Sequence, residues 1–436
     1  MSTNIKECLN AAIKNIDKKN ILFRYQEKID WNTDSINSIF NSSYPTFRFK
    51  YSNNIEYIGI DYCIKYNLQS ITSNWLDDLK SIQPTIQSFG NYKNKDLKIF
   101  GGVSFNIKEE LKAPWEDIPT IFFTIPKILI TKQKNDSFIS YHCLLNKDSN
   151  INRIINNYNS ILNDLKKNHS TIKNNLKFLK DVPERKEYTK IFNALIDNIY
   201  RKNINKVVLS RMKTHSISNK CILKKDELNC TNFHIDFTNN KRFIGSTPEK
   251  IIDIKNKKIT TQALAGTLRK SDNNNLDKFL KNKKELDEHQ YVVKDLIKKL
   301  NEFSNNISLS KKPTIIELEH LYHINTTIKG TLKKKIHILN ILYKLYPTPA
   351  VLGTPMNKAM ESIINNEPFD RGWYGGCVGW FNLKGEGRFD VAIRTALQKN
   401  NKLYSYAGSG LINNANENYE WEETQAKFSH LLSLID

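Results

Sequence analysis

Cysteine is sparse in this sequence, and its spacing excludes two common kinds of site. Six cysteines are scattered over 436 residues without any Cys-x-x-Cys pair, so neither a structural zinc site nor a disulfide framework is predicted. Long apolar runs are also missing: the N-terminal residues lack the apolar segment of a signal peptide, and the most apolar stretch, TIFFTIPKILI, is interrupted by Pro126 and Lys127. We therefore expect a cytoplasmic protein with reduced thiols and no membrane partner.

Acidic residues are scarce relative to basic ones. The chain has 66 Lys plus Arg against 45 Asp plus Glu, which gives a formal net charge of +21. Excess positive charge often indicates nucleic-acid binding, but here lysine is spread along the whole chain, and runs such as Lys333 to Lys335 contain no interleaved aromatic residues. We therefore expect no nucleic-acid partner, whereas a small anionic ligand is compatible with this charge.

The order of apolar patterns favours an α+β fold over a doubly wound one. The first 180 residues alternate apolar segments with polar stretches, which is typical of strands, loops and some helix. A helix is predicted over 181–202 from the spacing of its apolar residues, and the short strand NKVVLSR follows it. Because the strands do not alternate strictly with helices, a doubly wound sheet is disfavoured.

Two adjoining segments after residue 211 differ in pattern. The polar segment 212–241 predicts a loop or an irregular hairpin. The stretch RFIGSTPEKIIDI predicts two strands joined by a turn that contains Gly245 and Pro248.

Near the C-terminus the stretch NENYEWEETQAKF crowds three glutamates into a basic chain. A helix over 418–435 puts Glu420, Glu423 and Lys427 in one polar stripe, while Glu422 points elsewhere and is solvated. The apolar stripe of the same helix is formed by Trp421, Phe428, Leu432 and Ile435.

A second predicted helix, Lys284 to Leu300, has Glu285 and Glu288 one turn apart at the border of its apolar stripe. Like charges grouped in a partly dry site cost about 1–4 kcal/mol per close pair unless a cation lies between them. Carboxylates without thiols favour a hard ion, and Mg²⁺ is the natural candidate. The alternative is that these are ordinary surface glutamates, because acids spaced i, i+3 are common on helices.

Ten stretches of the C-terminal half resemble the chorismate-utilising enzymes, which include isochorismate, salicylate, anthranilate and aminodeoxychorismate synthases. The N-terminal half resembles them mainly in FGGVSF at 100–105. The ten stretches are KVVLSR at 206–211, GSTPEKI at 245–251, ALAGTLRK at 263–270, KELDEHQYVV at 284–293, LEHLYHINTTIKG at 318–330, YPTPAVLGTP at 346–355, FDRGWYGGCVGW at 369–380, VAIRTAL at 391–397, AGSGL at 407–411 and EWEETQAK at 420–427.

The resemblance implies a fold in which two large antiparallel β-sheets pack as a sandwich with flanking helices and the active site between them. Residues 1–180 would form the N-terminal part of the sandwich and residues 181–436 the chorismate-binding catalytic region, within one structural domain. The resemblance also implies a Mg²⁺ ion that bridges the substrate carboxylate to Glu288 and Glu423. Its supporting acids would be Glu285 and Glu420.

For isochorismate formation, the resemblance assigns Lys206 as the base that deprotonates water and Glu249 as the acid that protonates the leaving hydroxyl. Burial on an apolar strand disfavours the charged form of an amine, and the carboxyl must be held protonated. A solvent-facing lysine is the ordinary alternative for such a strand position.

The two carboxylates of chorismate require cations and amide donors. Strand alternation in VAIRTAL predicts that Arg394 shares a face with Ala392 and Ala396, which leaves room for a bidentate carboxylate. A turn over Gly408 to Gly410 would aim backbone N–H groups at the second carboxylate. A structural salt bridge or simple packing is the alternative for such residues, and His323 and Cys377 are interpreted as structural. The resemblance adds substrate contacts at Gly266, Thr267, His320, Tyr374, Ser409 and Lys427.

Within the family, the pattern favours isochorismate synthase. Ala265 replaces the lysine nucleophile of aminodeoxychorismate synthases, and ALAGT differs from the PIAGT usual in anthranilate synthases, so no glutaminase partner is expected. Salicylate synthase, which further eliminates pyruvate, is the closest alternative, but PTPAV at 347–351 resembles isochorismate synthases. A basic binding protein without catalysis is the alternative of another class. Whether the product serves menaquinone or siderophore synthesis is left open.

Overall fold

Strands form most of the regular structure, and successive pairings connect them into one large sheet that is antiparallel except where β1 meets β4. The structure is a computed structural model that describes residues 3–16, 20–30, 39, 42–52, 54–69, 76–77, 79, 85–89, 96–165, 174–238, 240–270, 276–310, 312–318 and 321–435. The strands are β1 Ile21–Ile29, β2 Thr46–Lys50, β3 Ile55–Leu68, β4 Thr85–Phe89, β5 Lys98–Val103, β6 Ile121–Gln133, β7 Asp136–Leu145, β8 Lys177–Val182, β9 Lys206–Ser216, β10 Thr231–Thr238, β11 Lys241–Thr247, β12 Lys250–Lys255, β13 Lys258–Arg269, β14 Ser304–Leu309, β15 Thr314–Glu317, β16 Leu321–Leu332, β17 Gly353–Thr354, β18 Cys377–Asn382, β19 Gly387–Val391, β20 Thr395–Lys399 and β21 Lys402–Leu411.

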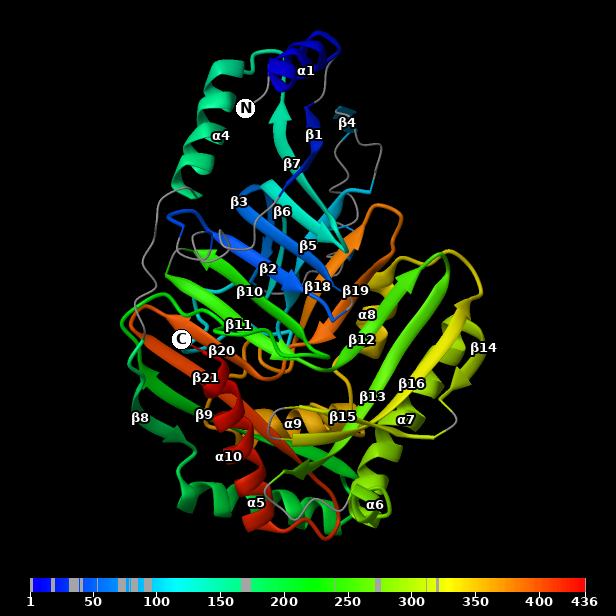
Figure 1. Cartoon of the computed structure of the whole chain (residues 1–436). Coiled ribbons are helices and arrows are strands. Elements are labelled where there is room, and N and C mark those ends of the chain that lie inside the picture. Colours follow the sequence, from blue (N-terminus) through cyan, green and yellow to red (C-terminus); the bar gives the residue numbers. More distant parts are fainter. Residues whose placement is uncertain are drawn as a thin grey trace.

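Helices flank this sheet at two ends (Figure 1). α1 and α4 pack together beside the N-terminal strands, whereas α5, α6, α7, α9 and α10 gather at the opposite end, where α7 packs on β13 and α10 on β21. The predicted α+β class with antiparallel sheets and flanking helices is thus confirmed. The helices are α1 Thr3–Lys14, α4 Ile151–Leu165, α5 Arg185–Tyr200, α6 Leu276–Phe279, α7 Lys283–Phe303, α8 Ile338–Leu345, α9 Met356–Asn366 and α10 Glu417–Leu434.

Strand pairings join the two halves of the sequence. β5 pairs with β18 from Lys98 opposite Asn382 to Val103 opposite Cys377, and β2 pairs with β10. The backbone hydrogen bonds of N-terminal strands are therefore completed by strands that lie nearly 200 or more residues further along the chain.

The helices predicted from apolar spacing are present. α5 precedes β9 as expected, and α7 packs on β13 and buries Val292, Leu296 and Leu300 in the hydrophobic core. Each of the two acid-bearing helices begins with an asparagine cap: Asn282 accepts from the Glu285 amide, and Asn416 accepts from the Tyr419 amide. An N-cap side chain satisfies one of the free amide groups of the first turn, which fixes where each helix begins.

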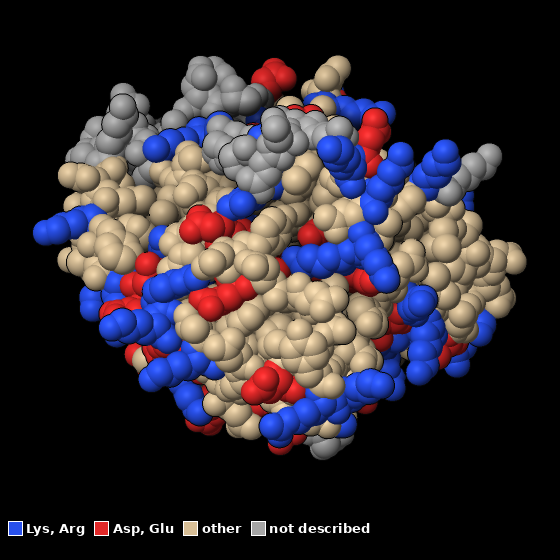
Figure 2. Space-filling model, turned by 90° about the horizontal axis from the view of Figure 1, so that it is seen from below, with Lys and Arg blue, Asp and Glu red and all other residues tan. Residues whose placement is uncertain are grey.

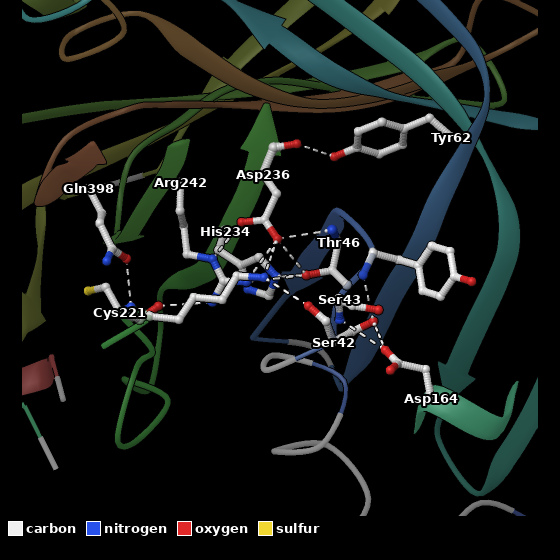
Figure 3. A network of polar contacts seen from close by, with 12 residues as sticks. Ser42, Ser43, Thr46, Tyr62, Asp164, Cys221, His234, Asp236, Arg242 and Gln398 are labelled. Atoms are coloured by element: carbon white, nitrogen blue, oxygen red, sulfur yellow. Dashed lines mark hydrogen bonds and ion pairs between the residues drawn. The ribbon is translucent and has the colours of Figure 1, made fainter. Parts of the chain in front are cut away.

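The prediction of a loop or irregular hairpin over 212–241 is wrong for much of its length, because β9 extends to Ser216 and β10 is almost fully buried. The sequence pattern did not indicate β10, because the strand buries three polar residues: Asn232, His234 and Asp236. Figure 3 shows Asp236 and His234 turned toward Thr46 and Arg242 in a network of polar contacts. A buried polar side chain is tolerated in a strand when its hydrogen bonds are made.

Asp236 is the centre of that network. Arg242 contacts both of its carboxylate oxygens, Nε at 2.6 Å and NH2 at 2.9 Å, and the Thr46 amide and hydroxyl each donate at 3.0 Å. Burial opposes the ionisation of Asp236, but the charges of Arg242 and Lys220 outweigh it and lower its pKa. The network ties β2 to β10 and β11 through charge as well as through backbone pairing.

The predicted strand, turn and strand over RFIGSTPEKIIDI is present as β11 and β12, with Pro248 between them. Gly245, however, lies inside β11 and not in the turn, which corrects that prediction. It faces Thr395 across the ladder, and a Cβ at this position would come within 2.6 Å of the Thr395 Cγ2 atom. The glycine is therefore needed for close strand packing.

No helix among the described residues is long and apolar enough to cross a bilayer. All six cysteines lie in the described ranges and are thiols. On the face drawn in Figure 2, Lys and Arg side chains are dispersed among acidic and uncharged residues.

Replacing Asp236 by alanine is expected to lower the free energy of unfolding by about 3–5 kcal/mol, because it leaves the buried Arg242 guanidinium without its counter-ion. Urea unfolding followed by circular dichroism measures this. The control is Asp136→Ala, which removes a pair to Lys28 whose side chains are 53% and 64% exposed. Equal small losses in both variants would contradict the stabilising role of the network.

Candidate active site

Ten of the predicted site residues line one cavity of about 60 Å³ between the sheet and α7 and α10. This volume has room for only a few water molecules. The ion pairs at its walls, Lys206 with Glu288 and Lys427 with Glu423, must therefore rearrange for a larger ligand to enter. Ser409 is buried close by on β21, while His320 lies outside the described residues. The ten residues are Glu249, Gly266, Thr267, Glu288, Tyr374, Arg394, Gly408, Gly410, Glu423 and Lys427.

The four carboxylates predicted from helical spacing converge from two helices. Glu285 is 2% exposed, and Glu420 and Glu423 are 0% and 5% exposed, whereas Glu422 points to solvent as predicted. Glu288 and Glu423 both face the cavity. These glutamates are therefore not ordinary surface residues. A glutamate is almost never fully buried unless it has a charged partner.

Each of three carboxylates is paired with a lysine. Nζ of Lys206 lies 2.9 Å from Glu288, Nζ of Lys427 lies 2.5 Å from Glu423, and Nζ of Lys284 lies 2.7 Å from Glu420. Burial opposes the ionisation of Glu288, but the charges of Lys206 and Lys284 outweigh it, so its pKa is lowered. The ion pairs thus supply the positive charge that the grouped acids require.

Glu285 and Glu420, the two predicted supporting acids, differ from Glu288 in the direction of their pKa shift. Burial, together with the negative charge of neighbouring glutamates, raises the pKa of both Glu285 and Glu420, and the charge of Lys284 offsets this only in part. The amide of Thr267 donates to Glu285 at 2.8 Å, while the Glu420 Oε2 atom is buried without a hydrogen-bond partner among the described residues. An unsatisfied buried carboxylate oxygen is costly and indicates a missing donor or cation.

A β-bulge makes the Thr267 contact possible. The pairing of β13 with β16 shifts register between Leu264 and Thr267, and Gly266 within the bulge has φ of +84°. This left-handed conformation is easily adopted by glycine. The bulge turns the Thr267 amide toward α7, so one glycine connects the sheet to the acidic cluster.

Lys206 and Glu249, the predicted base and acid, are both buried. Lys206 begins β9 and is 0% exposed, and Glu249 lies between β11 and β12 and is 2% exposed. Burial raises the pKa of Glu249 to about 8, only partly offset by the charge of Lys206 and a hydrogen bond from Thr348. This carboxyl is therefore largely protonated at neutral pH. The pair between Lys206 and Glu288 is a contact that the sequence did not predict.

The prediction that VAIRTAL is one continuous strand is wrong. β19 ends at Val391 and β20 begins at Thr395, because the Ala392 backbone instead bonds to Gly375 and Gly376. Arg394 lies in the interruption with φ of +54°, a conformation that is uncommon for residues other than glycine and often marks a functional position. Its side chain nevertheless reaches the cavity, as predicted.

Arg394 is oriented by His323, which the sequence interpretation treated as structural. NH2 of Arg394 donates to Nε2 of His323 at 2.8 Å, and burial followed by the Arg394 charge lowers the pKa of His323 well below its usual value. The neutral ring then accepts at Nε2 and donates from Nδ1 toward the Gly266 carbonyl, 3.3 Å away. NH1 of Arg394 has no partner within the described ranges, so it is available to an anion.

The prediction that the AGSG segment forms a turn is wrong. The segment is the last part of β21 and pairs with β9. Beyond Tyr406, β20 no longer covers its other edge, and the Gly408 carbonyl accepts from Lys427 at 2.7 Å on that side. Since the N–H and C=O of one strand residue point the same way, the Gly408 amide also points there. The segment can thus present an amide without forming a turn.

Glycine at position 410 leaves room for the side chains of Glu288 and Lys206. A Cβ there would lie 2.3 Å from Oε1 of Glu288 and 3.0 Å from Cε of Lys206. At Gly408, a Cβ would lie 2.9 Å from the hydroxyl of Tyr374. Both glycines therefore let side chains from other elements lie directly on the strand.

The cavity thus brings buried carboxylates and cations together between an antiparallel sheet and two helices. The chain belongs to the family described as chorismate binding enzyme, which it matches over residues 6–436. It is similar to isochorismate synthase MenF of Bacillus subtilis (strain 168), with 26% identity over 350 residues that cover 77% of this chain and 74% of that protein.

Isochorismate synthase DhbC of the same organism is 31% identical over 275 residues, which cover 58% of this chain and 69% of that protein. The solved structure of MenF, the menaquinone-specific isochorismate synthase from Escherichia coli, has a TM-score of 0.79 and 20% identity, and the match covers 99% of both chains. At that identity, the likeness shows a shared fold.

Lys284→Met is expected to lower the free energy of unfolding by about 2–4 kcal/mol in metal-free buffer, because Glu420 and Glu285 lose their nearest positive charge. The lower bound reflects a lysine side chain that is 22% exposed and thus partly screened. Denaturant titration measures the loss. Lys299→Met on the same helix is the control, since its partner Asp295 has a side chain that is 22% exposed, whereas Glu420 is 0% exposed. Similar losses in both variants would contradict the account.

Proposed function

We propose that this protein is an isochorismate synthase, which converts chorismate to isochorismate. The observation that carries the proposal is that the protonated carboxyl of Glu249 lines the cavity, while the buried amine of Lys206 lies 2.9 Å from Glu288 of the same cavity. Family membership and the similarity to proteins named isochorismate synthase support the same reaction.

The reaction exchanges one hydroxyl position for another. Lys206 in its neutral form takes a proton from water, and the resulting nucleophile bonds to ring carbon C2. The ring double bonds shift, the bond from C4 to its hydroxyl breaks, and Glu249 gives its proton to the departing oxygen. One water enters and one leaves, so substrate and product are isomers. Each proton transfer by a positioned group contributes about 10²- to 10⁴-fold to the rate.

Substrate recognition would use the cations that face the cavity. Arg394, with one free guanidinium nitrogen, binds one carboxylate, and the fixed ring of His323 keeps the guanidinium oriented. Lys427 and the Gly408 amide, on the open edge of β21, receive the other. Tyr374 lines the cavity beside them, and the substrate replaces ion pairs that close the cavity.

A divalent cation fits the acidic cluster, with Mg²⁺ as the proposed ion. Among the described residues no three acidic, histidine or cysteine side chains are arranged as a complete metal site. Mg²⁺, however, is commonly held by one or two carboxylates together with waters and an anionic substrate, and Glu288 and Glu423 face one cavity. Bound there, the ion would supply the positive charge that holds a substrate carboxylate. Glu285 and Glu420 would orient this shell, and Lys206 would lose its pairing with Glu288 and become free to act as the base.

We further propose that the chain forms one structural domain, since pairings between β5 and β18 and between β2 and β10 cross the boundary near residue 180. A cytoplasmic location is supported by six reduced cysteines. We propose that the reaction requires no glutaminase subunit, because water is the nucleophile.

Incubation of the purified protein with chorismate and Mg²⁺ is expected to yield isochorismate as the only product, and chelation of the metal is expected to abolish turnover. Chromatography of the products measures this. Salicylate with pyruvate would replace the proposal by salicylate synthase. Anthranilate formed when ammonia is supplied would replace it by anthranilate synthase, and unchanged chorismate under all these conditions would indicate a binding protein.

Lys206→Ala and Glu249→Gln are each expected to lower kcat by about 10²- to 10⁴-fold, because one removes the base and the other cannot donate a carboxyl proton. Since the pKa of Glu249 is raised to about 8, kcat/KM of the wild type should be level near neutral pH and fall about tenfold per pH unit above pH 8. Glu249→Gln should lack this alkaline limb.

Circular dichroism of both variants serves as the control for folding. Near-normal turnover of a folded Lys206→Ala protein would show that the base is misassigned. An alkaline limb that persists in Glu249→Gln would show the same for the acid.

A further inference from the structure

A buried ion pair lies next to the cavity without contacting it. Glu367, which follows α9, and Arg371 have side chains that are each 2% exposed. Nε of Arg371 donates to Oε2 of Glu367 at 2.7 Å, and NH2 donates to Oε1 at 2.5 Å. The guanidinium also lies over Phe105, with 4.5 Å to the ring centroid, and 6.0 Å from the Tyr374 ring. The Arg371 guanidinium is therefore held at its edge by the Glu367 carboxylate and at its face by the Phe105 ring.

The remaining donors of this guanidinium hold two separate backbone segments. NH2 of Arg371 donates to the Val208 carbonyl at 2.7 Å, and NH1 donates to the Val351 carbonyl at 2.8 Å. The carboxylate of Glu367 accepts from the Ser210 amide at 2.8 Å. One ion pair thus binds β9 at two positions and the segment before β17 at a third.

These attachment points lead to the base on one side and to the acid on the other. Val208 is two residues beyond Lys206 on β9, so fixing its carbonyl fixes the strand that presents the amine. Val351 belongs to the turn that begins at Thr348, whose hydroxyl donates to Glu249 at 3.4 Å. The same turn is tied to β9, because the Val208 amide donates to the Leu352 carbonyl at 3.0 Å.

We propose that Arg371, held by Glu367, is a positioning residue that sets the separation between the Lys206 amine and the Glu249 carboxyl. The inference rests on the proposed function, because it concerns the two groups that move protons there. A displacement of about 1 Å at a reacting group can lower the rate about 10²-fold. Lysine cannot replace this arginine, since a point charge with a flexible stem does not reproduce a planar fork with donors in fixed directions.

The test compares Arg371→Lys with the wild type under saturating chorismate and across pH. The variant is expected to lower kcat at least tenfold while KM changes less than about threefold, because the groups that bind substrate are untouched. Loss of the tie at Val351 also admits water to Glu249. Burial is the largest cause of the raised pKa of Glu249 and outweighs the opposite effect of a loosened Thr348 hydrogen bond, so the alkaline limb of the rate profile should move to lower pH. Glu367→Gln, which keeps the shape but not the charge, should change both quantities in the same direction.

Arg48→Lys is the matched control. Arg48 is also buried and paired with two carboxylates, Glu56 at 2.7 Å and Asp226 at 2.5 Å, but it lies on β2, which contributes no residue to the cavity. It should lose stability with kcat and the alkaline limb unchanged.

If Arg371→Lys and Glu367→Gln behave like this control, the inference is overturned while the proposed function stands. If Arg371→Lys does not fold, Glu367→Gln decides alone by the same two readouts. If the wild type forms no isochorismate, the proposed function itself fails, and the inference fails with it.

Discussion

Everything at this site depends on the burial of acids and amines together in a space with little water. A carboxylate removed from water is stable only if positive charge or hydrogen bonds replace its hydration. Glu288, Glu420 and Glu423 meet this requirement through lysines that come from β9, α7 and α10. The lysine partners can also be replaced, because another cation can take the place of a lysine beside its carboxylate, and the lysine can then pair with an anionic ligand.

The two groups proposed for proton transfer, Glu249 and Lys206, are both buried but have different surroundings. Glu249 has little compensation for its lost hydration, so burial raises its pKa and keeps it protonated at neutral pH. Lys206, on the neighbouring side of the cavity, is held by a carboxylate that belongs to the proposed metal shell. A protonated carboxyl and an amine can therefore be buried close to the same cavity, because each has its own surroundings: Glu249 has little compensating charge, whereas Lys206 has a carboxylate partner.

Helical periodicity was the part of the sequence that predicted most. The spacing of acids and apolar residues was enough to predict α7 and α10 and the exposure of Glu422. It left open whether the other glutamates were surface residues, and the structure buries Glu285, Glu420 and Glu423. The order of motifs predicted the fold class and ten residues of one cavity. Whether these residues perform the roles that the resemblance assigns stays a prediction until the reaction is measured.

Other features were not visible in the sequence because they depend on distant partners. β10 was missed because its polar residues are satisfied by Thr46, which is 188 residues away from His234, and by Arg242 on the neighbouring strand β11. The interruption at Arg394 arises from pairing with Gly375 and Gly376, and His323 was treated as structural because only the fold brings it to Arg394. His323 lies on β16 beside Tyr322 and Ile324, and the sequence around it has the spacing of neither a metal site nor a catalytic pair. No signal in the sequence could therefore have found this contact.

A crystal structure of this protein with Mg²⁺ and isochorismate is the most direct measurement of the central claim. The account predicts one ion held by oxygens of Glu288 and Glu423 at about 2.0–2.1 Å, with the Lys206 amine near C2 and the Glu249 carboxyl near C4 of the ring. An ion bound elsewhere, or a ring that places both groups on atoms other than these, would contradict it.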